Sequence, residues 1–184
     1  MTTIVLVPGY TNAGPEHWQS YIERKYDHVV RVQQENWNVP ERQIWIDKLN
    51  ETIISIKGKV LLVGHSCGAV AITQWSDTYS SDKVVGAMLV APADVDSPNA
   101  IPEIHIQRPL ALQPLPFPSK LVTSDNDAHV SLGRAYYFAE MWGSDIVVIP
   151  NAGHIHTDAG YGEWIEGEAI IEKLLQHPMH RISS

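Results

Sequence analysis

The 184-residue sequence contains one cysteine, Cys67, and no Cys-rich metal-binding pattern. A single thiol excludes an internal disulfide, and we predict neither a metal ion nor a cofactor. The sequence also lacks a run of about 18 apolar residues, and its first residues lack the basic and apolar segments of a signal peptide. We therefore expect no membrane attachment, with a reducing cytoplasm as the default location.

Positive charge is scarce. There are 13 lysines and arginines against 21 aspartates and glutamates, which gives a formal net charge of −8. No dense basic run is present, so neither nucleic acid nor an acidic membrane surface is expected as a partner. A small molecule is the partner that we predict, and the sequence leaves the oligomeric state open.

Apolar runs of strand length recur along the chain. Six of them cover residues 3–7, 28–32, 59–63, 84–90, 120–124 and 145–149. All but the second are almost continuous in Val, Ile and Leu, which is typical of a parallel sheet covered on both faces. Helical patterns cover residues 15–26, 41–56, 66–79, 131–142 and 161–175, with Pro15 expected at the first helical position. The alternation predicts one α/β domain over residues 1–184, a three-layer α/β/α sandwich.

Residues 92–118 break this rhythm, because they hold seven of the twelve prolines. A proline inside a helix costs about 3 kcal/mol, so a long helix is not expected there. We predict an irregular crossover with at most one short helix. It serves either as a plain surface connection or as a wall over a site, and the chain has no room for a large cap domain.

Ser66 lies between two glycines in "VLLVGHSCGA", where a strand pattern meets a helical pattern. Gly-x-Ser-x-Gly in this context is the nucleophile elbow, a sharp turn that projects the serine hydroxyl above the sheet edge. The N–H of Cys67, at the start of the helix, is then placed to stabilise an oxyanion. The alternative interpretation is an ordinary turn with a packed serine.

A serine nucleophile needs a base, and nine histidines are available. His154 follows the last strand pattern, so it is expected at the same carboxyl edge of the sheet as Ser66. His156 is the nearest rival. His65 adjoins the serine, but neighbours across a sharp turn usually point apart, which makes it a candidate for the pocket instead.

An acid must orient the base, and four aspartates follow strand patterns at this edge. Asp125 and Asp127 come after the fifth strand, and Asp94 and Asp96 after the fourth. The order Ser66, Asp127, His154 along the chain is that of nucleophile, acid and base in α/β-hydrolases.

The segment "VPGYTNAGPEHW" after the first strand is the candidate oxyanion loop. The N–H of Tyr10 is the better donor candidate and Thr11 the second, and Thr11 is also a pocket candidate. His17 and Trp18 are further pocket candidates, although both could instead fix the first helix to the loop.

Four motifs give the chain a family resemblance: "VPGYTNAGPEHW", "VGHSCGA", "SDNDAHVS" and "GHIHTDAGYGEWIEG". The sequence resembles the small serine hydrolases grouped with the retinoblastoma-binding-protein-9 and YdeN proteins. The resemblance implies an α/β-hydrolase core with Ser66 as nucleophile, Asp127 as acid and His154 as base. Ala128 stands where the family often has proline. Retinoblastoma binding is not carried over, because the sequence has no Leu-x-Cys-x-Glu string.

The function that these features predict is a metal-free serine hydrolase that cleaves small carboxylic esters through an acyl-enzyme. Two alternatives stay open: a peptidase or amidase with the same mechanism, and a protein-binding module with a vestigial triad.

Overall fold

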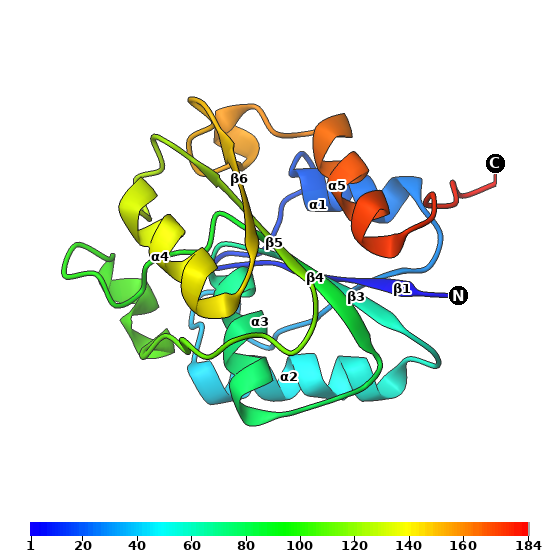
Figure 1. Cartoon of the computed structure of the whole chain (residues 1–184), viewed down its shortest axis with the longest axis horizontal. Helices are drawn as coiled ribbons and strands as arrows, with labels where there is room; N and C mark the ends of the chain where they lie inside the picture. The colour runs from blue at the N-terminus through cyan, green and yellow to red at the C-terminus, as the bar shows by residue number, and fades with distance from the viewer. Residues whose placement is uncertain (184) are drawn as a thin grey trace.

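The computed structural model describes residues 1–183, which form one parallel six-stranded sheet between two helical layers (Figure 1). The strand order is β2-β1-β3-β4-β5-β6, and every neighbouring pair is parallel. The strands are β1 (Thr3–Val7), β2 (Val29–Arg31), β3 (Val60–His65), β4 (Val84–Val90), β5 (Ser119–Ser124) and β6 (Asp145–Ile149). The predicted fold class is therefore confirmed, and no cap domain interrupts residues 1–183.

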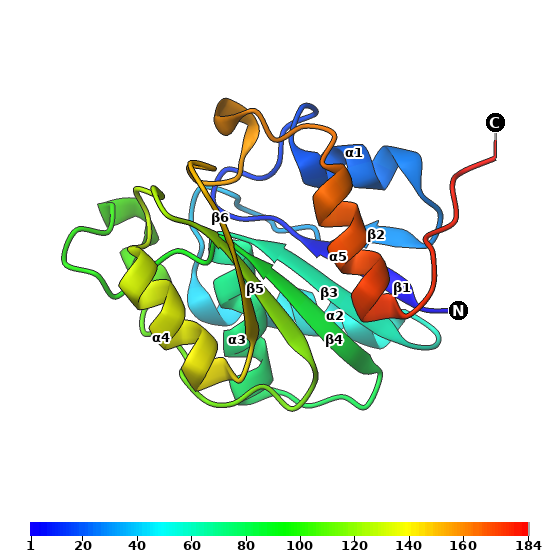
Figure 2. The same cartoon turned by 45° about the horizontal axis from the view of Figure 1, so that its top comes forward.

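Two helical layers cover the sheet, one on each face (Figures 1 and 2). α2 (Arg42–Ser55), α3 (Cys67–Thr78) and α4 (Leu132–Trp142) pack on one face, and α1 (Trp18–Lys25) and α5 (Ile165–Leu175) pack on the other. Successive strand residues alternate between the two cores: Val5 and Val7 face the α2–α4 layer, whereas Ile4 and Leu6 face α1 and α5. This alternation is the period of two expected of a strand buried on both sides.

The first helix is shorter than the sequence predicts. Pro15 lies in a turn rather than at the first helical position, and α1 begins at Trp18. The reason is that His17 is the N-cap: its Nδ1 accepts a hydrogen bond from the N–H of Gln19 at 3.1 Å. The predicted cap of α4 is confirmed, because Ser131 Oγ accepts from the N–H of Arg134 at 3.2 Å and Gly143 closes the helix in the left-handed conformation.

The proline-rich crossover between β4 and β5 is irregular, as expected, apart from the short 3₁₀ helix η1 (Pro102–Gln107). A second 3₁₀ turn, η2 (Thr157–Ala159), follows β6. In residues 1–183, no helix combines the length and the apolar character needed to cross a bilayer. The loops that leave the carboxyl ends of β1, β3, β5 and β6 meet at one edge of the sheet, and the candidate site lies there.

Candidate active site

Ser66 is the residue between β3 and α3, and its backbone is strained. Its φ of 57° and ψ of −122° lie in a region that residues with a side chain rarely adopt, at a cost of about 1–3 kcal/mol. The turn is held from both sides: the N–H of Ser66 donates to Val90 at 2.9 Å, and its carbonyl accepts from the N–H of Val70 at 3.1 Å. The strand-to-helix turn therefore has the backbone of a nucleophile elbow.

The flanking glycines are required by close packing rather than by positive φ. A Cβ at Gly68 would lie 1.9 Å from the carbonyl oxygen of Val7, and a Cβ at Gly64 would lie 2.8 Å from the backbone of Ala69. Helix α3 therefore starts directly against the end of β1, which brings the elbow and the loop after β1 together.

His154 lies in a tight turn after β6, between Gly153 and Ile155, which both have positive φ. Its carbonyl oxygen accepts a hydrogen bond from Nε2 of His65 at 2.8 Å, and that of Ile155 accepts from the indole N–H of Trp18 at 3.0 Å. The N–H of Gly153 donates to Asn126 Oδ1 at 2.7 Å. Three side chains from other elements thus fix the backbone that carries the imidazole.

The side chains of Ser66, His154 and Asp127 form one hydrogen-bonded chain. His154 Nε2 lies 2.8 Å from Ser66 Oγ, and its Nδ1 lies 2.8 Å and 3.0 Å from the two carboxylate oxygens of Asp127. Asp127 Oδ1 also accepts from the N–H of His129 at 2.8 Å. The Asp127 side chain is 0% exposed and that of His154 is 11% exposed, so both interactions are largely shielded from water.

The other candidate acids have different partners. Asp125 accepts from the N–H of Asn151 at 2.8 Å, Asp94 pairs with Arg134 at 2.9 Å, and Asp96 accepts from the N–H of Leu110 at 3.2 Å. Asp125 and Asp94 each connect two loops or elements, Asp96 binds within the β4–β5 crossover, and Asp127 is the one that reaches His154.

Two backbone N–H groups are available beside Ser66. Neither Tyr10 nor Cys67 donates its N–H to a backbone carbonyl in the loops and turns of residues 1–183, and the Tyr10 N–H lies toward the Cys67 thiol. The two N–H groups lie close together. Gly9 directly precedes Tyr10, and a Cβ on Gly9 would lie only 3.2 Å from the backbone nitrogen of Cys67. The N–H of Thr11, by contrast, donates to Trp37 at 2.9 Å. The geometry thus favours Tyr10 over Thr11 as an oxyanion donor.

A cavity of about 400 Å³ opens beside Ser66. The predicted pocket residues Thr11, His17 and His65 line it, together with the reacting pair Ser66 and His154. From the proline-rich crossover, Ala93, Ile101 and Ile104 contribute an apolar wall, which supports the wall interpretation of that segment. The remaining lining residues are Gly9, Tyr10, Asn12, Ala13, Gly14, Gln19, His129, His156, Thr157 and Asp158.

Trp18 is the pocket candidate that the structure places elsewhere. It is fully buried under the site, where its ring centroid lies 5.2 Å from that of Trp164. The side chain points into the core because α1 begins at this residue and packs its apolar face on the sheet. Its contribution to the site is the hydrogen bond to Ile155.

Four histidines surround His154, and burial lowers the pKa of each. Burial lowers the pKa of His17 to about 3 and that of His65 well below its usual value. It also lowers the pKa of His129 and His156, with the nearby His154 adding to the effect. These side chains are therefore neutral at pH 7, and His156, the rival base, makes no hydrogen bond to Ser66.

Cys67 is not a competing nucleophile. Its side chain is buried, and burial raises the pKa of the thiol to about 12. A thiolate is the reactive form of cysteine, so almost none is present at neutral pH. Its contribution to the site is the backbone N–H.

The sequence did not point to some of the residues that shape this site. Asn126 and Ser124 contact the backbone of Gly153, and His129 lines the cavity beside His154. Their only sequence signal was their place in "TSDNDAHV", next to the candidate acids.

A parallel sheet with this elbow and this Ser-His-Asp arrangement at its carboxyl edge defines an α/β-hydrolase fold. The family model described as serine hydrolase matches residues 4–173. The chain belongs to this serine hydrolase family, and we conclude that it is a hydrolase.

Solved structures agree with this assignment. A YdeN-like hydrolase from Pectobacterium atrosepticum is 32% identical, with a TM-score of 0.87 over 96% of this chain and 91% of that one. The YdeN protein of B. subtilis is 15% identical, with a TM-score of 0.75 over 96% of this chain and 100% of that one. Est1E from Butyrivibrio proteoclasticus, bound to ferulic acid, is 13% identical, with a TM-score of 0.72 over 96% of this chain and 89% of that one. The last two are similar in fold alone, and no curated protein matches the chain.

Proposed function

We propose that the protein hydrolyses small carboxylic esters through an acyl-enzyme on Ser66. The observation that carries the proposal is the continuous hydrogen-bonded chain from Ser66 through His154 to the buried Asp127, at the wall of a cavity. A serine hydroxyl is a weak nucleophile until an adjacent base removes its proton. The 2.8 Å contact between Ser66 Oγ and Nε2 of His154 supports His154 as this base.

The reaction follows from these contacts. Ser66 Oγ attacks the carbonyl carbon of the ester while His154 Nε2 takes the hydroxyl proton, and Asp127 accepts the hydrogen bond from Nδ1–H. The N–H groups of Tyr10 and Cys67 donate to the oxyanion. His154 then returns the proton to the leaving alcohol, and a water molecule repeats the sequence to release the acid. General base catalysis contributes about 10²- to 10⁴-fold and each oxyanion donor about 10²- to 10³-fold.

Labelling with a fluorophosphonate probe, followed by hydrolysis assays, tests this proposal. We expect stoichiometric labelling of the wild-type protein at Ser66, identified by peptide mass spectrometry, and no labelling of Ser66→Ala. The melting temperature of Ser66→Ala should not fall, because the substitution removes a hydroxyl and leaves the backbone turn in place. Ser80→Ala, at an exposed serine that does not line the cavity, is the matched control and should keep its label.

Two substrate series separate ester from amide cleavage. We expect turnover of p-nitrophenyl acetate and little turnover of aminoacyl arylamides. Faster arylamide turnover would favour the peptidase or amidase alternative, and a protein that neither labels nor turns over either series would favour the binding-module alternative.

A further inference from the structure

The loop after β1 lies directly against the elbow, and its backbone is strained. A Cβ at Gly9 would meet the carbonyl oxygen of His65 at 2.9 Å and Ser66 Cβ at 3.2 Å. Thr11 and Asn12 follow with φ values of 70° and 67°, in the left-handed region that threonine in particular rarely occupies. Two such residues in succession persist only when their surroundings hold them. The position of the intervening Tyr10 N–H depends on what holds this loop.

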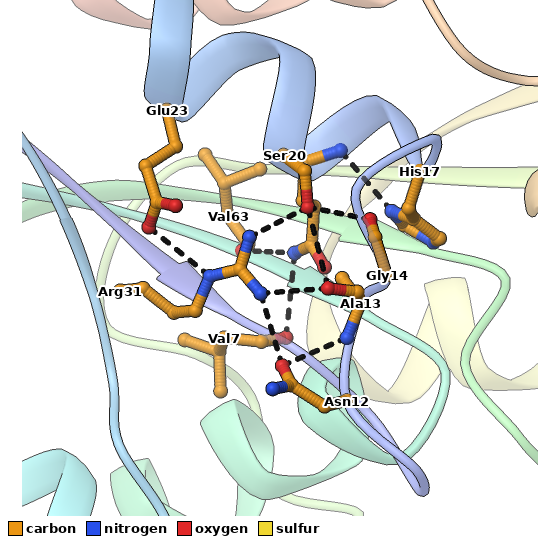
Figure 3. Close-up of polar contacts among 10 residues, drawn as sticks. Val7, Asn12, Ala13, Gly14, His17, Ser20, Glu23, Arg31 and Val63 are labelled. Carbon is orange, nitrogen blue, oxygen red and sulfur yellow. Dashed lines mark hydrogen bonds and ion pairs between the residues drawn. The ribbon is translucent and has the colours of Figure 1, made fainter.

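Arg31, at the end of β2, contacts the far side of this loop (Figure 3). Its Nη1 donates to Asn12 Oδ1 at 3.0 Å and to the carbonyl oxygen of Ala13 at 2.8 Å. Asn12 Oδ1 also accepts from the N–H of Ala13 at 2.7 Å, which closes a small ring of contacts. The guanidinium thus binds Asn12, the second of the two left-handed residues, and Ala13, which follows it.

Helix α1 completes the contacts of the guanidinium. Arg31 Nη2 donates to Ser20 Oγ at 2.7 Å, and that hydroxyl donates to the carbonyl oxygen of Gly14 at 2.7 Å. Arg31 Nε donates to Glu23 at 3.1 Å, one helical turn beyond Ser20. Figure 3 shows the guanidinium between the helix and the loop, with all its nitrogens engaged. The side chain is only 9% exposed, so these contacts are poorly screened by water.

The strand register explains why this residue reaches the loop. Arg31 is paired with Leu6 of β1, two residues before the loop begins at Pro8. Arginine suits the position because its planar group offers several donors in a fixed fork, whereas lysine offers one compact charge.

We propose that Arg31 is a positioning residue for the oxyanion hole. By binding Asn12, Ala13 and, through Ser20, Gly14, it holds the loop against the elbow and keeps the Tyr10 N–H directed at the oxyanion. This inference rests on the proposed ester hydrolysis. Arg31 touches no reacting atom and acts through the backbone of the loop.

Kinetics of Arg31→Lys and Arg31→Met test the proposal. We expect kcat for p-nitrophenyl acetate to fall roughly 10- to 100-fold in both, with KM changed less than about threefold, because a displaced oxyanion donor weakens the transition state more than the bound ester. Labelling by the fluorophosphonate should slow in parallel. The pH profile of kcat/KM should keep its midpoint, because the His154 and Asp127 contacts are untouched. An unchanged kcat in either folded variant would overturn the proposal.

Two further variants keep the test independent of stability. Asn12→Gly tolerates the left-handed backbone and removes one loop-side acceptor of Arg31, and we expect a loss in kcat of about three- to tenfold. Glu168→Gln weakens a different ion pair, in which the Glu168 carboxylate lies 2.9 Å from Lys25 Nζ. This variant should have a lower melting temperature without a lower kcat at 25 °C. If kcat tracks the melting temperature across all four variants, Arg31 is merely structural. A wild-type protein without labelling or turnover would instead reject the proposed function itself.

Discussion

Asp127→Asn changes donors and acceptors at the site while almost preserving shape. In the wild type, Asp127 Oδ1 accepts from the N–H of His129 at 2.8 Å, and both carboxylate oxygens lie within 3.0 Å of His154 Nδ1. Asparagine has one acceptor oxygen, and the partly buried N–H of His129 requires it. The amide NH₂ must then face His154 Nδ1 as a donor.

This arrangement reverses the tautomer of His154. When Nδ1 accepts a hydrogen bond, the imidazole proton lies on Nε2, which faces Ser66 Oγ at 2.8 Å. A protonated Nε2 cannot take the serine proton. The same substitution in a serine protease lowers kcat about 10⁴-fold, so we expect a loss in kcat/KM of roughly 10³- to 10⁴-fold, or about 4–5 kcal/mol of transition-state stabilisation.

The assay is the initial rate of p-nitrophenyl acetate hydrolysis at pH 7.5, with folding checked by circular dichroism. Asp125→Asn is the matched control, because it makes the same chemical change two residues away. Asp125 is exposed and accepts one hydrogen bond from Asn151, which an amide oxygen can also accept, so its activity should stay within about threefold of wild type. An Asp127→Asn variant with more than a tenth of wild-type activity, or an equal loss in Asp125→Asn, would refute the reasoning.

Three other predictions concern stability, reactivity and substrate size. The pKa of His17 is about 3 in the folded protein and about 6.5 in the unfolded chain, so the fold favours the neutral side chain. The stability that depends on neutral His17 is therefore complete above about pH 6.5 and is lost as the pH falls. His17→Asn keeps an N-cap acceptor but has no group that titrates in this range. In urea unfolding, the free energy of unfolding of the variant should therefore fall by about 2 kcal/mol less than that of the wild type between pH 7.5 and pH 5. Iodoacetamide at pH 8 should leave Cys67 unmodified, as measured by mass spectrometry, and modification of the folded protein would contradict its burial. Each methylene of the acyl chain contributes about 0.8 kcal/mol only while it is buried, and the cavity has a volume of about 400 Å³. The p-nitrophenyl esters from acetate to hexanoate should therefore be cleaved with a higher kcat/KM than the laurate, and an optimum at twelve carbons would disprove this.

The sheet and the elbow could be predicted from sequence because their signals are local. Continuous Val, Ile and Leu runs mark strands that are buried on both faces, and each predicted run corresponds to an observed strand within about two residues. The glycines around Ser66 reflect packing within ten residues of the serine and against the end of β1.

The local sequence pattern left the choice between Asp125 and Asp127 open, and only the family resemblance pointed to Asp127. Both aspartates follow β5, and residue type cannot distinguish them. Their roles are set by the pairing of Ser124 with Ile149 and by Asn126, which binds the N–H of Gly153. These contacts place Asp125 beside Asn151 and Asp127 beside His154, across about 27 residues of sequence.

Arg31 was not predicted for the same physical reason. It stands in the weakest strand pattern, and its partners lie 8 to 19 residues away on a helix and a loop. No spacing rule joins such residues. For Trp18 the sequence left a pocket role and a structural role open, and the burial that decides between them depends on where α1 begins.

The conformational strain around the site identifies the part of the active centre that is held most weakly. Ser66 and Ile155 have positive φ, but the core of the sheet holds the first, and the fully buried indole of Trp18 binds the carbonyl of the second. Thr11 and Asn12 have a similar backbone strain of about 1–3 kcal/mol each, yet they lie in the loop between β1 and α1. Their contacts are hydrogen bonds rather than core packing: Asn12 accepts from Arg31, and the N–H groups of Thr11 and Asn12 donate to the carbonyl oxygens of Trp37 and Gly9. Substitutions that loosen this loop should therefore impair catalysis before they unfold the protein.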